Sequence, residues 1–418
     1  MREAVFADNI IFNLLGKQLL IDRLVHAINF AKNTVQHLLI EGHSAPEDAP
    51  WYVRPEKIIA ETAFLIAFTK SNRSYAEVSY SINELAEILI PLARSKTMLL
   101  NISLKPELAL DYAHAHICLH YAGYPDEKFD KAVAASLRSM ACNGIERTPY
   151  RMMEREWLMS IWDSAYDDNL KFWIPLSCLK HPVNLFSESS DGVYAITHAI
   201  MYAFFGRGEI PGLEVETLFQ TVETLLIRYM DEQNYDIAGE LLMAWPLLRK
   251  EMNPIIAFAI DCLFKIETKV GFLPSPGLDT SRLDPNDQNS RRTYIYSINY
   301  HTVLVMGLLC NCLLTNACGK EIIIEKTAYS EELKNILTKE LRSKEHLHWV
   351  ELFMSIDKQC QEQLLPWLYQ ICLIRWIKEK KYGNVKKLLE LTGNEFDKLV
   401  VGRQTCELLQ RLAGIADI

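Results

Sequence analysis

Three histidines and an aspartate fall within one apolar segment of the chain, DYAHAHICLHY, at residues 111–121. Imidazoles and carboxylates transfer protons and bind divalent metals, and burying either of them is costly unless another group pairs with it. His116 and His120 are four residues apart, so they share one face of a helix. Asp111 and His114, three residues apart, share another. The neighbouring elements must therefore supply partners for these groups.

Three later segments combine an apolar sequence with isolated ionisable residues. They are GVYAITHAIMYAFFG with His198, YDIAGELLMAWPLL with Asp236 and Glu240, and YSINYHTVLVMGLLC with His301. Asp236 and Glu240 are four residues apart, so both carboxylates emerge from the same side of a helix. Glu240 stands between a glycine and a leucine in an apolar stretch, where an unpaired carboxylate would cost free energy.

We expect one site to collect these groups. The predicted metal ligands, from three different helices, are His116, His198 and His301. They suit a divalent ion such as Zn or Fe, and no nucleotide cofactor is indicated. Glu240 or Asp236 is expected to complete the site as a catalytic carboxylate, with Asp111 orienting it from behind.

Two other interpretations of the same residues remain open. Without a metal, the histidines and carboxylates can act as general acid and base. A histidine in a helical core is also often a hydrogen-bonded structural residue, and Asp236 follows Asn234 and Tyr235, where it could simply cap a helix. The spacing contains no local motif that fixes two ligands and a base together.

Apolar residues recur at helical spacing along almost the whole chain, whereas the alternation typical of strands is nearly absent. Nearly uncharged segments alternate with amphipathic ones such as FDKAVAASLRSM and LEVETLFQTVETLLIRYM. A helix that is apolar all round is buried, and an amphipathic one meets water on one side. The pattern predicts an all-α protein, an α/α barrel with inner and outer helix rings; a helical-repeat solenoid is the alternative.

The barrel prediction divides the chain into three regions. Residues 1–100 are expected to form a helical segment packed on the barrel, 101–320 the barrel core with the site, and 321–418 a C-terminal helical layer. We interpret His26, His37 and His43 as surface or loop residues. Residues 269–294 contain several prolines and glycines and are interpreted as a long connection that forms a lid over one mouth of the barrel.

The composition excludes several classes of protein. A net charge of -9 without a basic tract argues against a nucleic-acid partner. The ten cysteines form no CxxC pair and are expected to be reduced thiols in the cytoplasm. The first residues lack a signal-peptide pattern, and the longest apolar run, 303–314, is shorter than the roughly 20 residues that span a bilayer. We therefore expect a cytoplasmic protein without a membrane partner.

Several short motifs resemble an uncharacterised bacterial family, a domain of unknown function often encoded beside natural-product biosynthesis genes. They include THAIMY at 197–202, DIAGELL at 236–242, GFLP at 271–274 and YHT at 300–302. The resemblance implies a bacterial tailoring enzyme of peptide or other secondary metabolism, with a small-molecule or peptide substrate. The competing prediction is a non-catalytic helical scaffold that binds a peptide or protein; a protein partner or a homo-oligomer is compatible with both.

Overall fold

The structure is a computed structural model that describes residues 16–43, 54–181, 183–205, 213–283, 287–315, 330–342, 347–392 and 399–416. Every regular element in these residues is a helix, and they contain no strand. The prediction of an all-α protein is confirmed.

The helices of the first half of the chain are α2 (Lys17–Thr34), η1 (Val35–Ile40), α3 (Pro55–Phe68), η3 (Thr69–Asn72), α4 (Ala76–Ala93), α5 (Lys96–Leu104), η4 (Pro106–Leu108), α6 (Ala109–Tyr121), α7 (Glu127–Leu137), α8 (Pro149–Trp162), α9 (Leu170–Trp173), η5 (Ile174–Leu176) and α10 (Ser190–Phe204). Those of the second half are α11 (Val215–Asp231), α12 (Tyr235–Leu242), α13 (Ala244–Leu247), α14 (Pro254–Val270), η6 (Thr280–Arg282), α15 (Gln288–Thr315), α16 (Glu331–Arg342), α17 (His348–Ser355), α18 (Lys358–Gln363), α19 (Leu365–Lys378), α20 (Tyr382–Thr392) and α21 (Val400–Ala416).

The ends of many helices follow from local sequence. Proline opens α3, α8 and α14, a position where its missing N–H costs nothing. The Asn253 side chain caps α14 by accepting a hydrogen bond from the N–H of Ile256. Gly271 ends the same helix with a φ of 92°, a left-handed conformation that other residues rarely adopt.

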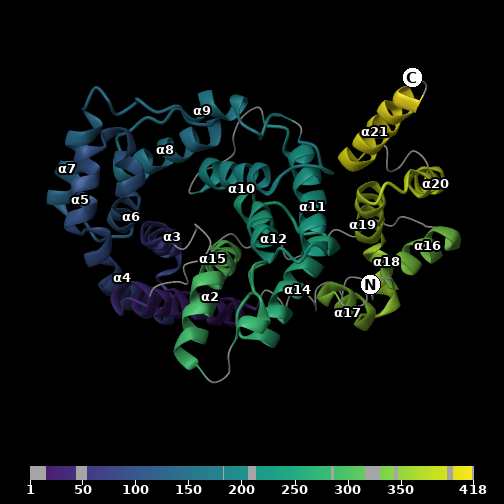
Figure 1. Cartoon of the computed structure of the whole chain (residues 1–418), viewed down its shortest axis with the longest axis horizontal. Helices are drawn as coiled ribbons and strands as arrows, with labels where there is room; N and C mark the ends of the chain where they lie inside the picture. Colours follow the sequence, from purple (N-terminus) through teal and green to yellow (C-terminus); the bar gives the residue numbers. More distant parts are fainter. Residues whose placement is uncertain are drawn as a thin grey trace.

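Six helices form a closed cycle of contacts. Along the cycle α3 contacts α6, α6 contacts α8, α8 contacts α10, α10 contacts α12, α12 contacts α15, and α15 contacts α3. Figure 1 shows these helices around the middle of the molecule, with α2, α4, α5, α7 and α11 on the outside. Side chains that point inward from the cycle therefore meet one another, although they come from residues 55–315.

Two glycines allow close approach between helices of the core. A Cβ on Gly239 of α12 would lie 2.6 Å from Cγ1 of Val305 on α15. A Cβ on Gly307 of α15 would lie 2.7 Å from the Cβ of Ala27 on α2. Gly239 directly precedes Glu240, so the close contact between α12 and α15 also sets the distance between Glu240 and His301.

Helix α15 is longer than its apolar run predicted. It has 28 residues because the polar residues 288–294 continue the helix instead of belonging to the loop. It is the one helix of the described residues that is long and apolar enough to cross a membrane, and 83% of that apolar window is buried in the fold. This burial is typical of the core helix of a soluble protein.

The connection before α15 is shorter than predicted. Helix α14 continues to Val270 and α15 begins at Gln288, so residues 288–294 are helical. Leu273 is fully buried, the N–H of Ser275 donates to Oδ1 of Asn299 at 2.8 Å, and the N–H of Asp279 donates to the hydroxyl of Tyr294 at 2.9 Å. The described part of this connection is thus fixed on α15, and residues 284–286 lie outside the described residues.

The C-terminal helices form a separate layer that packs on α11 and α14 through α19, α21 and α17 (Figure 1). Arg375 of α19 donates two hydrogen bonds to the carboxylate of Asp231 at the end of α11, at 2.9 and 2.7 Å. The indole N–H of Trp349 donates to the same carboxylate at 3.3 Å. Since Arg375 is only 6% exposed, this is a largely buried ion pair between the two layers.

Candidate functional site

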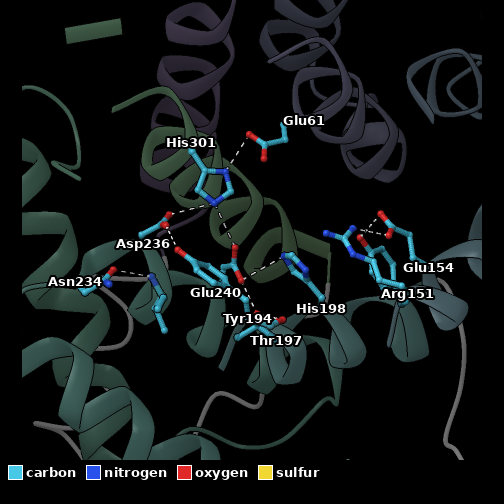
Figure 2. A network of polar contacts seen from close by, with 12 residues as sticks. Glu61, Arg151, Glu154, Tyr194, Thr197, His198, Asn234, Asp236, Glu240 and His301 are labelled. Atoms are coloured by element: carbon cyan, nitrogen blue, oxygen red, sulfur yellow. Dashed lines mark hydrogen bonds and ion pairs between the residues drawn. The ribbon is translucent and has the colours of Figure 1, made fainter. Parts of the chain in front are cut away.

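The six helices of the cycle direct ionisable side chains toward one another. We call these residues the central cluster: Glu61 of α3, His114 of α6, Glu154 of α8, His198 of α10, Asp236 and Glu240 of α12, and His301 of α15. Figure 2 shows most of them, with His301 above the α12 carboxylates and His198 beside Glu240.

His301 faces a carboxylate at each of its ring nitrogens. Nδ1 lies 3.0 Å from Oε2 of Glu61. Nε2 lies 3.4 Å from Oδ1 of Asp236 and 3.5 Å from Oε1 of Glu240. Burial disfavours a charged ring, but these carboxylates outweigh it and raise the pKa of His301 well above its usual value. The ring is therefore held as an imidazolium.

The two carboxylates of α12 have pKa values shifted in opposite directions. Burial and the neighbouring Glu240 raise the pKa of Asp236, even though its Oδ2 accepts a hydrogen bond from Tyr194 at 2.5 Å. Burial also opposes charge on Glu240, but His198 and His301 lower its pKa. Glu240 faces two histidines and Asp236 faces one, so the ionised form of Glu240 is the better stabilised of the two.

Of the two ring nitrogens of His198, Nε2 faces Glu240 and Nδ1 has no polar partner among the described residues. Its Nε2 lies 3.8 Å from Oε2 of Glu240, an oxygen that also accepts a hydrogen bond from the Thr197 hydroxyl at 2.5 Å. Its Nδ1 is buried and has no hydrogen-bond partner among the described residues. The rings of Tyr150, Tyr194 and Tyr202 surround it at centroid distances of 6.1, 6.0 and 6.0 Å.

The cluster continues toward α8 and α6. Oε2 of Glu154 accepts a hydrogen bond from Arg151 at 2.7 Å, and Oε1 accepts one from the Tyr202 hydroxyl at 3.0 Å. Burial opposes the charge of Glu154, but Arg151, His114 and His198 lower its pKa. Burial lowers the pKa of His114, so that ring is held neutral beside Glu154.

The histidines are more accessible than the α12 carboxylates behind them. The side chains of His301, Glu61 and His198 are 24%, 23% and 23% exposed. Those of Asp236 and Glu240 are 8% and 2% exposed. The rings of His301 and His198 are therefore partly open to solvent, although Nδ1 of His198 is itself buried, and Asp236 and Glu240 lie behind them.

The sequence of this region matches a known family. Residues 27–311 match a family described as a domain of unknown function, DUF6895. The chain belongs to this family. The match includes every residue of the central cluster, and the prediction of an uncharacterised domain family is confirmed. The curated proteins and the solved structures each gave no match.

His116 of the DUF6895 domain lies in a different network from His198 and His301, which corrects the predicted set of ligands. The Nε–H of Arg94 donates to its Nδ1 at 3.1 Å, so Nε2 carries the proton and donates to Oδ1 of Asp130 at 3.0 Å. The same oxygen accepts a hydrogen bond from Trp162 at 2.7 Å. Both nitrogens of His116 are thus occupied by residues of α4 and α7, and His116 has a structural role.

Asp111 also lies apart from the central cluster. Its carboxylate accepts two hydrogen bonds from Arg147, at 2.8 and 3.3 Å, and its side chain is 44% exposed. It therefore ties the start of α6 to the connection before α8 and does not orient Glu240 or Asp236.

The DUF6895 domain contains groups that could hold a metal ion, but they differ from the predicted set. Among the described residues, three ligand atoms lie within 4.8 Å of one another in two groups: His37, Glu41 and His43; and His116, His120 and Asp130. His26 is exposed and His43 half-buried, as expected, whereas His37 is only 6% exposed. The surface interpretation of His37 is therefore wrong.

Several residues of the site were missed from the sequence. Glu61 is an isolated carboxylate in the apolar segment IIAETAFLIAF, which is the same signal that pointed to Glu240. Tyr194, Arg151 and Glu154 carry no such signal, because tyrosines and charged residues on an amphipathic helix are ordinary.

Proposed function

We propose that the central cluster is the active site of an enzyme that works by general acid–base catalysis. The observation that carries this proposal is geometric: His301 faces Glu61 at one ring nitrogen and Asp236 and Glu240 at the other. Burial raises the pKa of Asp236, whereas the two histidines lower that of Glu240. Neighbouring titratable groups whose environments separate their pKa values are typical of catalytic acids and bases.

His198 is the base in this proposal. Glu240 faces Nε2 of His198 and favours the tautomer with the hydrogen on Nε2, so the lone pair of the buried Nδ1 is left for a substrate proton once the surrounding tyrosine rings move. The distance of 3.8 Å between Nε2 and Oε2 is longer than a hydrogen bond, and such contacts often tighten when substrate binds. The unpartnered Nδ1 is the feature that a structural histidine would lack.

His301 is the acid. Glu61 holds its Nδ1–H, and its Nε2–H is delivered to the atom of the substrate on which negative charge develops. One turnover then adds a proton to His198 and removes one from His301, and exchange with solvent through the partly exposed rings restores both. An elimination, an isomerisation or a hydrolysis releases one proton to a base and takes one from an acid in this way.

The charges of the cluster define the substrate class. Burial raises the pKa of Asp236, and the charges of Glu61, Glu154 and Glu240 are balanced by Lys57, Arg151 and the His301 imidazolium, so a substrate of little net charge is favoured. The surrounding tyrosine rings favour a neutral or cationic small molecule or peptide with an apolar face.

The finer expectations from the sequence belong to the same proposal. We propose that the cycle of six helices is the inner ring of an α/α toroid, supported by the alternation of uncharged and amphipathic segments. A bacterial, cytoplasmic tailoring enzyme of secondary metabolism is supported by the motifs quoted above. If the protein is instead a non-catalytic scaffold, the central cluster catalyses no reaction.

Two measurements test the proposal. In ¹⁵N-histidine NMR at neutral pH, we expect both nitrogens of His301 to be protonated and His198 to carry its proton on Nε2. A His198 tautomer with the proton on Nδ1 would contradict the base assignment, because no lone pair would then be available to the substrate.

Turnover is sought by incubating the purified chain with bacterial metabolite extracts and following consumption by mass spectrometry. We expect His198→Gln and His301→Gln to slow consumption by about 10² to 10⁴-fold. His348→Gln is the matched control, because His348 faces Glu351 at 3.8 Å on α17, outside the central cluster. Full activity in His198→Gln would exclude the proposed base.

A further inference from the structure

A second cluster of ligand-type residues lies outside the central cluster, at the end of the π-helix η1. Nδ1 of His37 is 3.4 Å from Oε2 of Glu41, and Nε2 of His43 is 3.5 Å from the same oxygen. We call His37, Glu41 and His43 the η1 cluster. Gly42 between them has a φ of 74°, a conformation that turns the chain and lets the ring of His43 stack on that of His37 at 4.2 Å.

The hydrogen bonds of Thr293 fix the tautomer of His37. The Thr293 hydroxyl donates its hydrogen to the carbonyl oxygen of Asn289 at 3.0 Å. With its hydrogen directed there, the hydroxyl accepts a hydrogen bond from Nε2 of His37, which lies 2.8 Å away. Nδ1 then has a bare lone pair that points at the carboxylate of Glu41.

A lone pair facing an anionic oxygen is repulsive unless a proton or a metal cation lies between them. A cation shared by Nδ1 and the carboxylate removes the repulsion.

His43 is supported in a similar way. Its Nδ1 lies 3.1 Å from the side-chain amide of Asn289, one helical turn before Thr293 on α15. In the structure the amide nitrogen donates to Nδ1, so a metal at Nε2 requires this amide to turn by 180° and present its oxygen to Nδ1–H. Residues that hold the outward nitrogen of each imidazole are the usual support of histidine ligands in metal sites.

We propose that His37, Glu41 and His43 bind a divalent transition-metal ion, with Zn²⁺ the best fit to two imidazoles and a carboxylate. With Zn bonds of about 2.0 to 2.2 Å, the edges of a tetrahedral site measure about 3.3 to 3.6 Å. The separations of 3.4 and 3.5 Å already match these edges. Glu41 and His43 are 45% and 34% exposed, so water can fill the fourth position.

The group of His116, His120 and Asp130 provides a contrast. There the nitrogen of His116 that faces the carboxylate carries a hydrogen, because Arg94 donates to the other nitrogen at 3.1 Å. The carboxylate oxygen also accepts a hydrogen bond from Trp162. The lone pair of His116 therefore does not face the carboxylate, and the guanidinium of Arg94 opposes a metal cation.

Zn²⁺ titration of the full chain, first freed of metal with a chelator, tests the proposal. By calorimetry we expect one Zn²⁺ per chain. Glu41→Gln and His43→Asn should bind at least about 100-fold more weakly, and Thr293→Val about 10 to 100-fold more weakly. Thr293→Ser should restore affinity because it keeps the hydroxyl. His120→Asn is the matched control and should bind as the wild type does.

The ligand variants change exposed side chains, so circular dichroism should confirm that they stay folded. Zn²⁺ should also raise the unfolding temperature of the wild type and of His120→Asn, but not of His43→Asn. The proposal is overturned if the wild type binds no Zn²⁺ at micromolar concentrations. Unchanged affinity in Glu41→Gln and His43→Asn, or loss of binding in His120→Asn, would overturn it equally.

Discussion

Glu240→Gln is the substitution that most directly tests the electrostatics of the central cluster. The glutamine has the shape of the glutamate and still accepts a hydrogen bond from Thr197, but it removes the charge that faces both histidines. At 3.5 Å and an effective dielectric constant of about 20, the ion pair with His301 amounts to about 5 kcal/mol. Opposing terms reduce this: Glu61 and Asp236 still face the imidazolium, and Glu240 no longer has to be buried with its charge.

We therefore expect the free energy of unfolding of Glu240→Gln to fall by about 1 to 3 kcal/mol near pH 6. The pKa of His301 should fall by about 1 to 3 pH units. Chemical denaturation measures the first quantity and NMR titration of labelled histidine measures the second. Glu216→Gln is the control, because Glu216 is 69% exposed and pairs with Lys250 at the surface, where such a pair contributes less than about 1 kcal/mol.

The loss should depend on pH in a defined way. The pKa of Glu240 is lowered on folding, so its stabilisation is complete above the ordinary value of 4.5 and is lost as the pH falls. The pKa of His301 is raised, so its stabilisation is complete below the ordinary value of 6.5 and is lost as the pH rises through the raised value. The difference between wild type and variant should therefore be largest between these values. Equal losses for Glu240→Gln and Glu216→Gln at every pH would refute this reasoning.

Two further substitutions test the packing that positions the cluster. Gly239→Ala places a Cβ 2.6 Å from Val305 and should lower the free energy of unfolding by about 1 to 3 kcal/mol in chemical denaturation. Gly383→Ala is the control, because no atom lies within 4 Å of its Cβ, and it should not lower the free energy of unfolding in this way. Arg375→Met leaves the Asp231 carboxylate unpaired and should cost about 3 to 5 kcal/mol; a loss below 1 kcal/mol would mean that the ion pair does not hold the C-terminal layer.

The sequence was informative where an ionisable residue stood alone in an apolar segment. Asp236, Glu240, His198 and His301 were identified in this way, and the structure brings them together. The physical reason is that a buried charge requires a partner, and the most economical partner is another buried charge. Glu61 carries the same signal and could have been identified by the same argument.

The sequence was less informative about local geometry. His37 lies on a helical pattern whose regular spacing gives no sign of the π-helix at 35–40, and the wider turn alters which side chains face the core. The start of α15 was interpreted as part of a loop because residues 288–294 are polar. Their helical conformation depends on packing against η1, through contacts such as that between Thr293 and His37, which spacing cannot predict.

The histidines of helix α6 point to different neighbours, and each of these neighbours supplies a polar partner. Neighbouring elements supply polar partners to three faces of α6. Arg147 binds Asp111, and His116 lies between Asp130 and Arg94. Glu154 lies near His114.

Only His114 of α6 faces the central cluster. The spacing of the histidines showed that α6 has distinct faces but could not show which face meets which neighbour, because this depends on the rotation of the helix in the fold. The charge on the adjacent helix, and not the number of histidines in the segment, therefore decides which of them belongs to the central cluster.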